Sequence, residues 1–68
     1  MINYGEELKY HRTVRNLTIR ELERDTGILN SNLSRWENGK AIPSIDFCVK
    51  LADYYGITLD ELIGREIK

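Results

Sequence analysis

Apolar residues recur at helical spacing along this chain of 68 residues. Leu29, Leu33 and Trp36 stand at positions i, i+4 and i+7, which places them on one side of a helix. Tyr4 and Leu8 begin a similar stripe near the start of the chain, and a third apolar set runs through residues 45–55. There is no internal repeat, linker or low-complexity segment. The pattern therefore predicts an all-α fold in a single domain over residues 1–68.

Capping residues, glycines and a single proline set the helix boundaries. Thr18 with Glu21, and Thr58 with Glu61, have the spacing of a capping box, in which each member bonds the other's backbone N–H. Gly27 is expected to end a helix, because glycine adopts the left-handed backbone conformation at low cost. The predicted helices span about 4–15, 19–26, 30–38, 45–55 and 59–63. The second and third form a helix–turn–helix hairpin over about 18–38.

The third predicted helix has an unusual polar side. Opposite its apolar stripe stand Asn30, Ser31, Ser34 and Arg35. Such a row of amides, hydroxyls and one guanidinium is suited to base edges in the DNA major groove. The alternative is an ordinary solvated face, but the Lys and Glu residues that usually make up such a face are absent here.

The stretch from Thr18 to Lys40 resembles the helix-turn-helix of the Cro/C1-type (XRE-like) phage-repressor family. The resemblance covers about residues 4–63 and implies a compact five-helix, lambda-repressor-like DNA-binding domain. The matching positions within the motif are Leu22, Gly27, Leu33, Ser34, Trp36, Glu37, Asn38 and Gly39. Further matches flank it at Gly5–Leu8, Arg12, Pro43–Ser44, Leu51–Ala52 and Gly56–Leu62.

Taken position by position, the resemblance implies which residues contact DNA. The base-contacting set is Asn30, Ser31, Asn32 and Arg35, and the phosphate-contacting set is Thr18, Arg20, Ser34, Asn38 and Lys40. Asparagine pairs naturally with adenine and arginine with guanine. The resemblance also implies that Arg12 and Glu37 form a structural clasp between the first and third helices. The alternative is two solvated charges, worth under about 1 kcal/mol as a pair.

Three positions depart from the family pattern. Ile19 stands where a phosphate-binding glutamine is common, which weakens one anchor on DNA. Glu23 replaces a small alanine, so we expect the second helix to tilt or Glu23 to lie at a rim. Leu29 replaces a capping Ser or Thr, which removes a cap worth about 1 kcal/mol. Leu29 could instead touch a thymine methyl group.

The fourth predicted helix carries more apolar surface than a small monomer needs. One stripe comprises Ile45, Cys48, Val49 and Ala52, and the other comprises Phe47, Leu51, Tyr54 and Tyr55. We expect one stripe to cover the first three helices and the other to be shared between the fifth helix and a partner subunit. The alternative is that the second stripe packs entirely under the fifth helix. The predicted homodimer interface is Phe47, Tyr54, Tyr55, Ile63 and Ile67.

The charge is unusual for a DNA-binding protein. Ten Lys and Arg residues against eleven Asp and Glu residues give a net charge of −1, whereas nucleic-acid-binding domains are usually basic. Residues 1–40 hold seven basic and six acidic side chains, and residues 41–68 hold three and five. The predicted DNA-binding half is thus the less acidic one. Local geometry must then supply most of the affinity, and non-specific binding should be weak.

Other functional classes have little support. One histidine, His11, and one cysteine, Cys48, supply neither a catalytic triad nor a metal site, and both are expected to be packing residues. No glycine-rich loop cradles a phosphate, so no enzyme activity and no cofactor are expected. No apolar run reaches the length of a membrane span, and no signal peptide is recognisable, which favours a cytoplasmic protein.

The sequence thus favours a sequence-specific DNA-binding transcriptional regulator. The resemblance implies a repressor that binds a pseudo-palindromic operator in double-stranded DNA as a homodimer. The alternative is a protein-binding module, similar to an antitoxin or anti-repressor, that keeps the fold but binds DNA weakly. The acidic balance and Ile19 favour that alternative.

Overall fold

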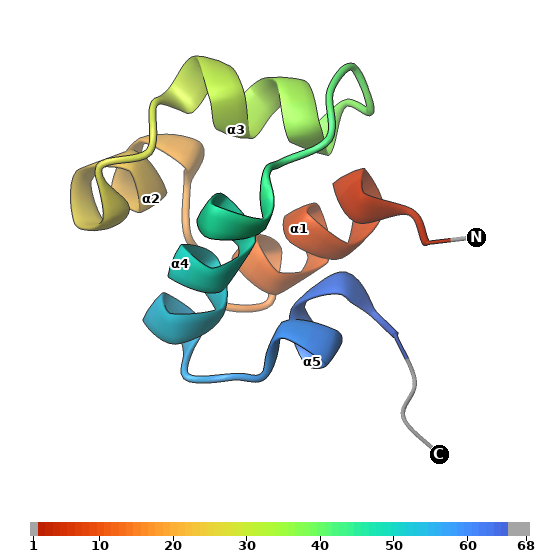
Figure 1. Ribbon diagram of the computed structural model, residues 1–68. Coiled ribbons are helices and arrows are strands. Elements are labelled where there is room, and N and C mark those ends of the chain that lie inside the picture. The colour runs from red at the N-terminus through yellow and green to blue at the C-terminus, as the bar shows by residue number, and fades with distance from the viewer. Residues whose placement is uncertain (1, 66–68) are drawn as a thin grey trace.

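The computed structural model describes residues 2–65, and within them every regular element is an α-helix. The helices are α1 (Tyr4–Thr13), α2 (Ile19–Thr26), α3 (Asn30–Glu37), α4 (Ile45–Tyr55) and α5 (Leu59–Ile63). Figure 1 shows α3 along the top of the molecule and α5 at the opposite end, with α1 and α4 between them. The prediction of an all-α, five-helix fold is confirmed.

Side-chain caps begin four of the five helices, as the sequence indicates. The Thr18 hydroxyl accepts from Glu21 N at 3.0 Å, and the Glu21 carboxylate accepts from Thr18 N at 2.9 Å. Thr58 and Glu61 repeat this capping box at 3.1 Å in both directions. The bonds from the threonines lower the pKa of both glutamates, because they stabilise the carboxylate form. Asn3 and Ser44 cap α1 and α4.

Two helices are shorter than predicted at their carboxyl ends. The first ends at Thr13 rather than near residue 15, because the chain turns through Asn16 at φ 56° and Leu17 N donates back to Arg12 O at 3.2 Å. The third ends at Glu37, and Asn38 is its C-cap. Gly27 ends α2 at φ 77°, as predicted.

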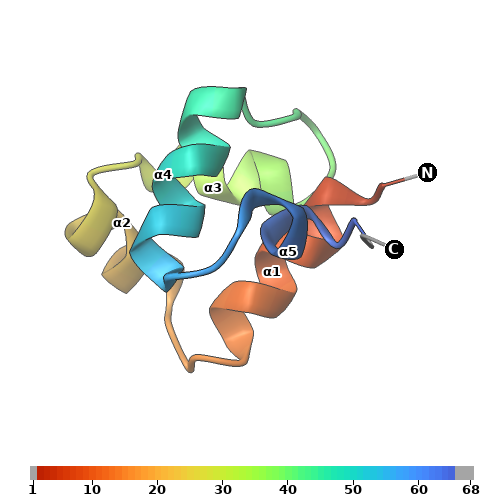
Figure 2. The same ribbon diagram turned by 60° about the horizontal axis from the view of Figure 1, so that its bottom comes forward.

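One core joins all five helices and the turn between α2 and α3. Its buried members are Leu8, Leu22, Ile28, Leu33, Trp36, Cys48, Leu51, Ala52 and Leu62. Gly5 lets α1 approach the end of α3 closely, since a Cβ there would lie 2.6 Å from Trp36 O and 2.9 Å from Glu37 O. Figure 2 shows α5 beside α1. The packed helix pairs are α1 with α3 and α5, α2 with α3 and α4, and α4 with α5.

The predicted division of α4 into two stripes is wrong. Its buried residues, Cys48, Leu51 and Ala52, come from both stripes, whereas Ile45 and Val49 are 63% and 44% exposed. Apolar residues surround most of this helix, so periodicity alone does not fix which side faces inward. Packing against α2 and α5 selects the side between the two stripes.

Candidate nucleic-acid interface

The third helix is held by its apolar side and leaves its polar side on the surface. Leu33 and Trp36 are only 2% and 5% exposed. On the other side, Asn30, Ser31 and Arg35 are exposed, and Asn32 and Ser34 are half-buried. Because α3 lies at the edge of the molecule (Figure 1), this polar side is available to a ligand as large as a DNA duplex.

Two contacts fix the carboxyl end of α3. The Trp36 ring packs against Phe47 of α4, with centroids 5.1 Å apart. The Glu37 carboxylate accepts from Arg12 Nε at 2.7 Å and from Arg12 Nη2 at 2.8 Å, which ties α3 to α1. Arg12 also donates to Leu17 O at 2.8 Å. The structure therefore brings together the two residues of the clasp, whose side chains are 13% and 6% exposed.

The Arg12 guanidinium is stabilised in its charged form. Its bonds to Glu37 raise the pKa of Arg12, while partial burial acts in the opposite direction. A bidentate pair of this kind has fixed geometry as well as favourable charge. The clasp thus sets the position of α3 relative to α1 without using any residue on the polar side of α3.

The residues predicted to contact phosphates lie at both ends of the helix–turn–helix. Thr18 and Arg20 are exposed at the start of α2, although the Thr18 hydroxyl already accepts the capping bond from Glu21. Asn38 and Lys40 are exposed just beyond α3. The side chain of Asn38 donates to Ser34 Oγ at 3.3 Å, so these two polar groups partly satisfy each other.

A contact between α2 and α3 was not anticipated from the sequence. Glu23 Oε2 accepts from Asn30 N at 3.0 Å, and Glu23 Oε1 accepts from Asn30 Nδ2 at 3.1 Å. Leu29, the N-cap residue of α3, makes no side-chain cap, as expected. Glu23, which is half-buried, takes over that function, a role beyond the expected tilt of α2 or place at a rim. The sequence did contain a signal for this contact: α3 starts without a capping side chain of its own, and a carboxylate, Glu23, stands seven residues before its first residue, Asn30.

The other two family departures lie at different depths. Ile19 is half-buried and packs against the core, so this position offers no polar group to a phosphate. Leu29 is 59% exposed at the start of α3, where an apolar contact with a base remains sterically open.

His11 is a packing residue rather than a chemical group at the surface. It is 9% exposed, its Nε2 donates to Glu61 O at 2.8 Å, and its ring stacks on Tyr55. The Arg15 guanidinium lies over the Tyr55 ring, with its central carbon 4.2 Å from the ring centroid. Within residues 2–65, no three His, Cys, Asp or Glu side chains are grouped as metal ligands.

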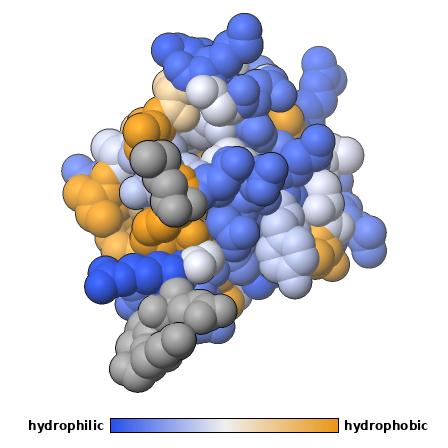
Figure 3. Space-filling model, turned by 90° about the vertical axis from the view of Figure 1, so that its right-hand side faces the viewer, coloured by the Kyte–Doolittle hydropathy of each residue, from blue (hydrophilic) through white to orange (hydrophobic). Residues whose placement is uncertain are grey.

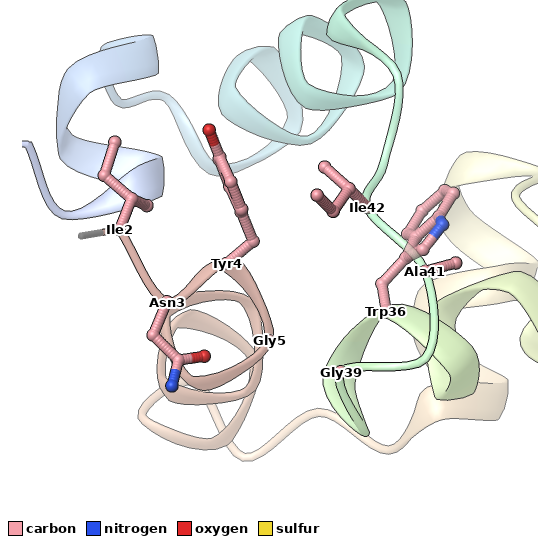
Figure 4. A pocket seen from close by; sticks show the side chains of 8 residues that line it. All are labelled: Ile2, Asn3, Tyr4, Gly5, Trp36, Gly39, Ala41 and Ile42. Carbon is pink, nitrogen blue, oxygen red and sulfur yellow. The ribbon is translucent and has the colours of Figure 1, made fainter.

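An apolar groove lies beside the carboxyl end of α3. One hollow of about 430 Å³ lies between α1 and the turn after α3, with Tyr4 and Ile42 on facing sides (Figure 4). A second, of about 240 Å³, shares these two residues and extends to Ile45 and Ile63. Figure 3 shows hydrophobic residues gathered on this side of the molecule. None of the helices within the described part of the chain is both long and apolar enough to span a bilayer.

Comparison with known proteins assigns the family. A family described as helix-turn-helix matches residues 8–62. The chain is 33% identical over 60 residues to the cryptic phage CTXphi transcriptional repressor RstR of Vibrio cholerae, covering 88% of this chain and 54% of RstR. It is 29% identical over 65 residues to the transcriptional activator BcrR of Enterococcus faecalis, covering 96% of this chain and 32% of BcrR.

A relative of similar length is also found. An HTH-type transcriptional regulator of Methanocaldococcus jannaschii is 30% identical over 60 residues, which cover 88% of this chain and 91% of that protein. By contrast, the chain spans about a third of BcrR and about half of RstR. With the buried stripe, the polar side of α3 and the family match together, this chain belongs to the Cro/C1-type helix-turn-helix family of DNA-binding transcriptional regulators.

Proposed function

We propose that this protein is a sequence-specific repressor that binds a pseudo-palindromic operator as a homodimer, with α3 of each subunit in a major groove. The observation that carries the proposal is the two-sided character of α3. Leu33 and Trp36 anchor it, while Ser31 and Arg35 stay exposed. The similarity to the phage repressor RstR supports repression. Occupancy of a promoter would be sufficient for that action, and it would take place in the cytoplasm.

The proposed contacts follow from exposure and side-chain chemistry. Arg35 would donate to guanine O6 and N7, and Asn30 would pair with adenine. Ser31 and Asn32 would reach neighbouring base edges. The proposed phosphate contacts are Thr18, Arg20, Ser34, Asn38 and Lys40, which hold the domain on the duplex without reading sequence.

The dimer interface is better placed on the apolar groove than on α4 alone. Of the residues first expected there, Phe47, Tyr55 and Ile63 are half-buried within the monomer, Tyr54 is 38% exposed, and Ile67 lies outside the described residues. The most exposed apolar side chains nearby are Ile42 at 72%, Ile45 at 63% and Val49 at 44%. We propose that these three, with Ile63, form the contact between subunits.

This surface suits the geometry of a palindromic site. Ile42 follows the end of α3 by five residues, so pairing there would place the carboxyl ends of the two α3 helices near the subunit contact. The half-sites would then be centred about 34 Å apart, one turn of DNA. Two linked α3 helices also bind DNA far more tightly than one.

Selection of duplexes from a random pool tests the proposal directly. The expected product is a two-fold symmetric sequence with half-sites one turn apart. Binding should weaken with salt with a log–log slope near −5, if the dimer contacts about six phosphates. Arg35→Ala should relax preference at one base pair of each half-site, and Lys40→Ala should weaken all sequences alike. Undiminished operator affinity in Arg35→Ala would refute the assignment of α3.

The same assay separates the competing function. The net charge of −1 and the packing of Ile19 into the core favour a protein-binding module with weak DNA binding. Such a module would show no salt-sensitive binding to any duplex. Sedimentation of an Ile45→Asp variant tests the interface, since a buried carboxylate there should give monomers while the fold is kept.

A further inference from the structure

We propose that Glu23 is a positioning residue for sequence reading: it holds Asn30 ready for one base pair without touching DNA itself. The inference rests on the proposed function, because it concerns how α3 reads an operator. It is carried by the two hydrogen bonds between the Glu23 carboxylate and Asn30, at 3.0 Å and 3.1 Å.

The first bond supports the start of the recognition helix. The first N–H groups of a helix have no partner within it, and Leu29 offers no side-chain acceptor. Glu23 Oε2 accepts from the first of these groups, Asn30 N. A negative charge at this end of a helix is also favourable, because the helix dipole is positive there. Glu23 therefore fixes the first turn of α3 from the neighbouring helix.

The second bond orients the reading side chain. An ionised carboxylate only accepts hydrogen bonds, so the nitrogen of the Asn30 amide must face Glu23 and its oxygen must face away. Among the described residues, no hydrogen bond uses the other N–H of that nitrogen or the Oδ1 acceptor. A donor and an acceptor side by side are what a bidentate contact with adenine requires. Glu23 thus restricts the Asn30 side chain before DNA binds, which lowers the conformational entropy that Asn30 loses on binding.

The contact follows from two departures from the family pattern acting together. A small residue at position 23 could not reach Asn30, and a capping residue at position 29 would compete for the same end of the helix. Here position 23 carries the carboxylate and position 29 carries the exposed Leu29. The reading unit at the start of α3 is therefore a pair, Glu23 with Asn30, rather than a single side chain.

The test measures base discrimination in the full chain, using the duplex that the chain selects from a random pool. Each half-site base pair is changed in turn, and affinity is measured for Asn30→Ala, Glu23→Ala, Glu23→Gln, Arg35→Ala and the double variant of Asn30→Ala with Glu23→Ala. Glu23→Gln keeps the size but has one acceptor oxygen, so only one of the two bonds survives. Asp53→Asn is the charge-matched control, because Asp53 is exposed on α4 and forms none of the side-chain hydrogen bonds among the described residues.

We expect Asn30→Ala and Glu23→Ala to lose discrimination at the same base pair, by about fivefold or more, which is the smaller end of what one bidentate contact provides. Glu23→Gln should lose part of it, and Asp53→Asn none. Glu23→Ala should add little further loss in the Asn30→Ala background, because the two residues act as one unit. Thermal unfolding of each variant reports the separate effect of the lost cap.

Several results would overturn the inference. If Glu23→Ala weakens every duplex alike, or changes only the melting temperature, Glu23 is merely a cap. If Arg35→Ala alters one base pair but Asn30→Ala alters none, Asn30 does not read sequence, and the inference fails while the proposed function stands. If the pool yields no preferred sequence, or if neither Arg35→Ala nor Asn30→Ala changes the preference at any base pair, the proposed function fails as well.

Discussion

The clasp between α1 and α3 provides the sharpest stability prediction. Glu37→Gln removes the negative charge but keeps one acceptor for the Arg12 guanidinium. Breaking a buried ion pair on one side costs about 3–5 kcal/mol, because the remaining charge is left uncompensated. Arg12 is 13% exposed and keeps its bond to Leu17 O, so the lower end of the range applies, about 3 kcal/mol.

This loss is large for a chain of this length. A stability of about 0.05–0.15 kcal/mol per residue gives roughly 3–10 kcal/mol for 68 residues. At about 4–8 °C per kcal/mol, the melting temperature should fall by roughly 12–24 °C. Asp60→Asn is the matched control, since its pair with Arg65 is 3.9 Å long and the two side chains are 34% and 69% exposed. It should cost under about 1 kcal/mol.

Urea denaturation followed by circular dichroism measures the loss of stability in both variants. In an Arg12→Met background, the effect of Glu37→Gln on stability should change sign. In Arg12→Met the Glu37 carboxylate is itself unpaired and 6% exposed, so Glu37→Gln should now stabilise the protein. A loss in the wild-type background no larger than that of Asp60→Asn would refute the clasp as a structural element. The clasp would also be refuted if Glu37→Gln cost the same stability in the wild-type and Arg12→Met backgrounds.

Four further predictions concern packing and titration. Gly5→Ala should cost about 1–3 kcal/mol of unfolding free energy in urea, since the added methyl would meet Trp36 O at 2.6 Å. Tyr55→Phe should leave stability unchanged or raise it, because its buried hydroxyl has no hydrogen-bond partner among the described residues. Tyr54→Phe should lower stability slightly, because it removes the exposed 2.6 Å bond to Asp25. Burial raises the pKa of Tyr55 to about 12, so the protonated form stabilises the fold below pH 10 and that stabilisation disappears as the pH rises toward 12. Absorbance at 295 nm should show an ionisation near pH 12 that is missing in Tyr55→Phe; an ionisation lost in Tyr55→Phe with its midpoint near 10 would contradict this.

Helix positions could be predicted because their determinants are local in sequence. Thr18 with Glu21, and Thr58 with Glu61, fix helix starts through bonds spanning three residues, and Gly27 marks an end through its own backbone conformation. The polar side of α3 was also predictable, since the stripe formed by Leu33 and Trp36 determines what lies opposite.

Two features could not be predicted in this way. The facing of α4 depends on which neighbours pack against it, and a helix with apolar residues on most sides accepts several rotations. The bond between Glu23 and Asn30 depends on the angle between α2 and α3 and on two side-chain rotamers. Sequence indicated only that Glu23 and Leu29 were unusual, and it did not indicate that one compensates for the other.

The contact between Glu23 and Asn30 has a practical consequence for engineering altered specificity. Transplanting α3 alone into a relative with alanine at the position of Glu23 would leave the graft without its cap and with a freely rotating amide at its first residue. A successful chimaera must exchange parts of both helices. Conversely, a mutagenesis library that varies only the exposed residues of α3 leaves Glu23 of α2 in place. Glu23 then still limits which side chains can work at Asn30, the first residue of α3.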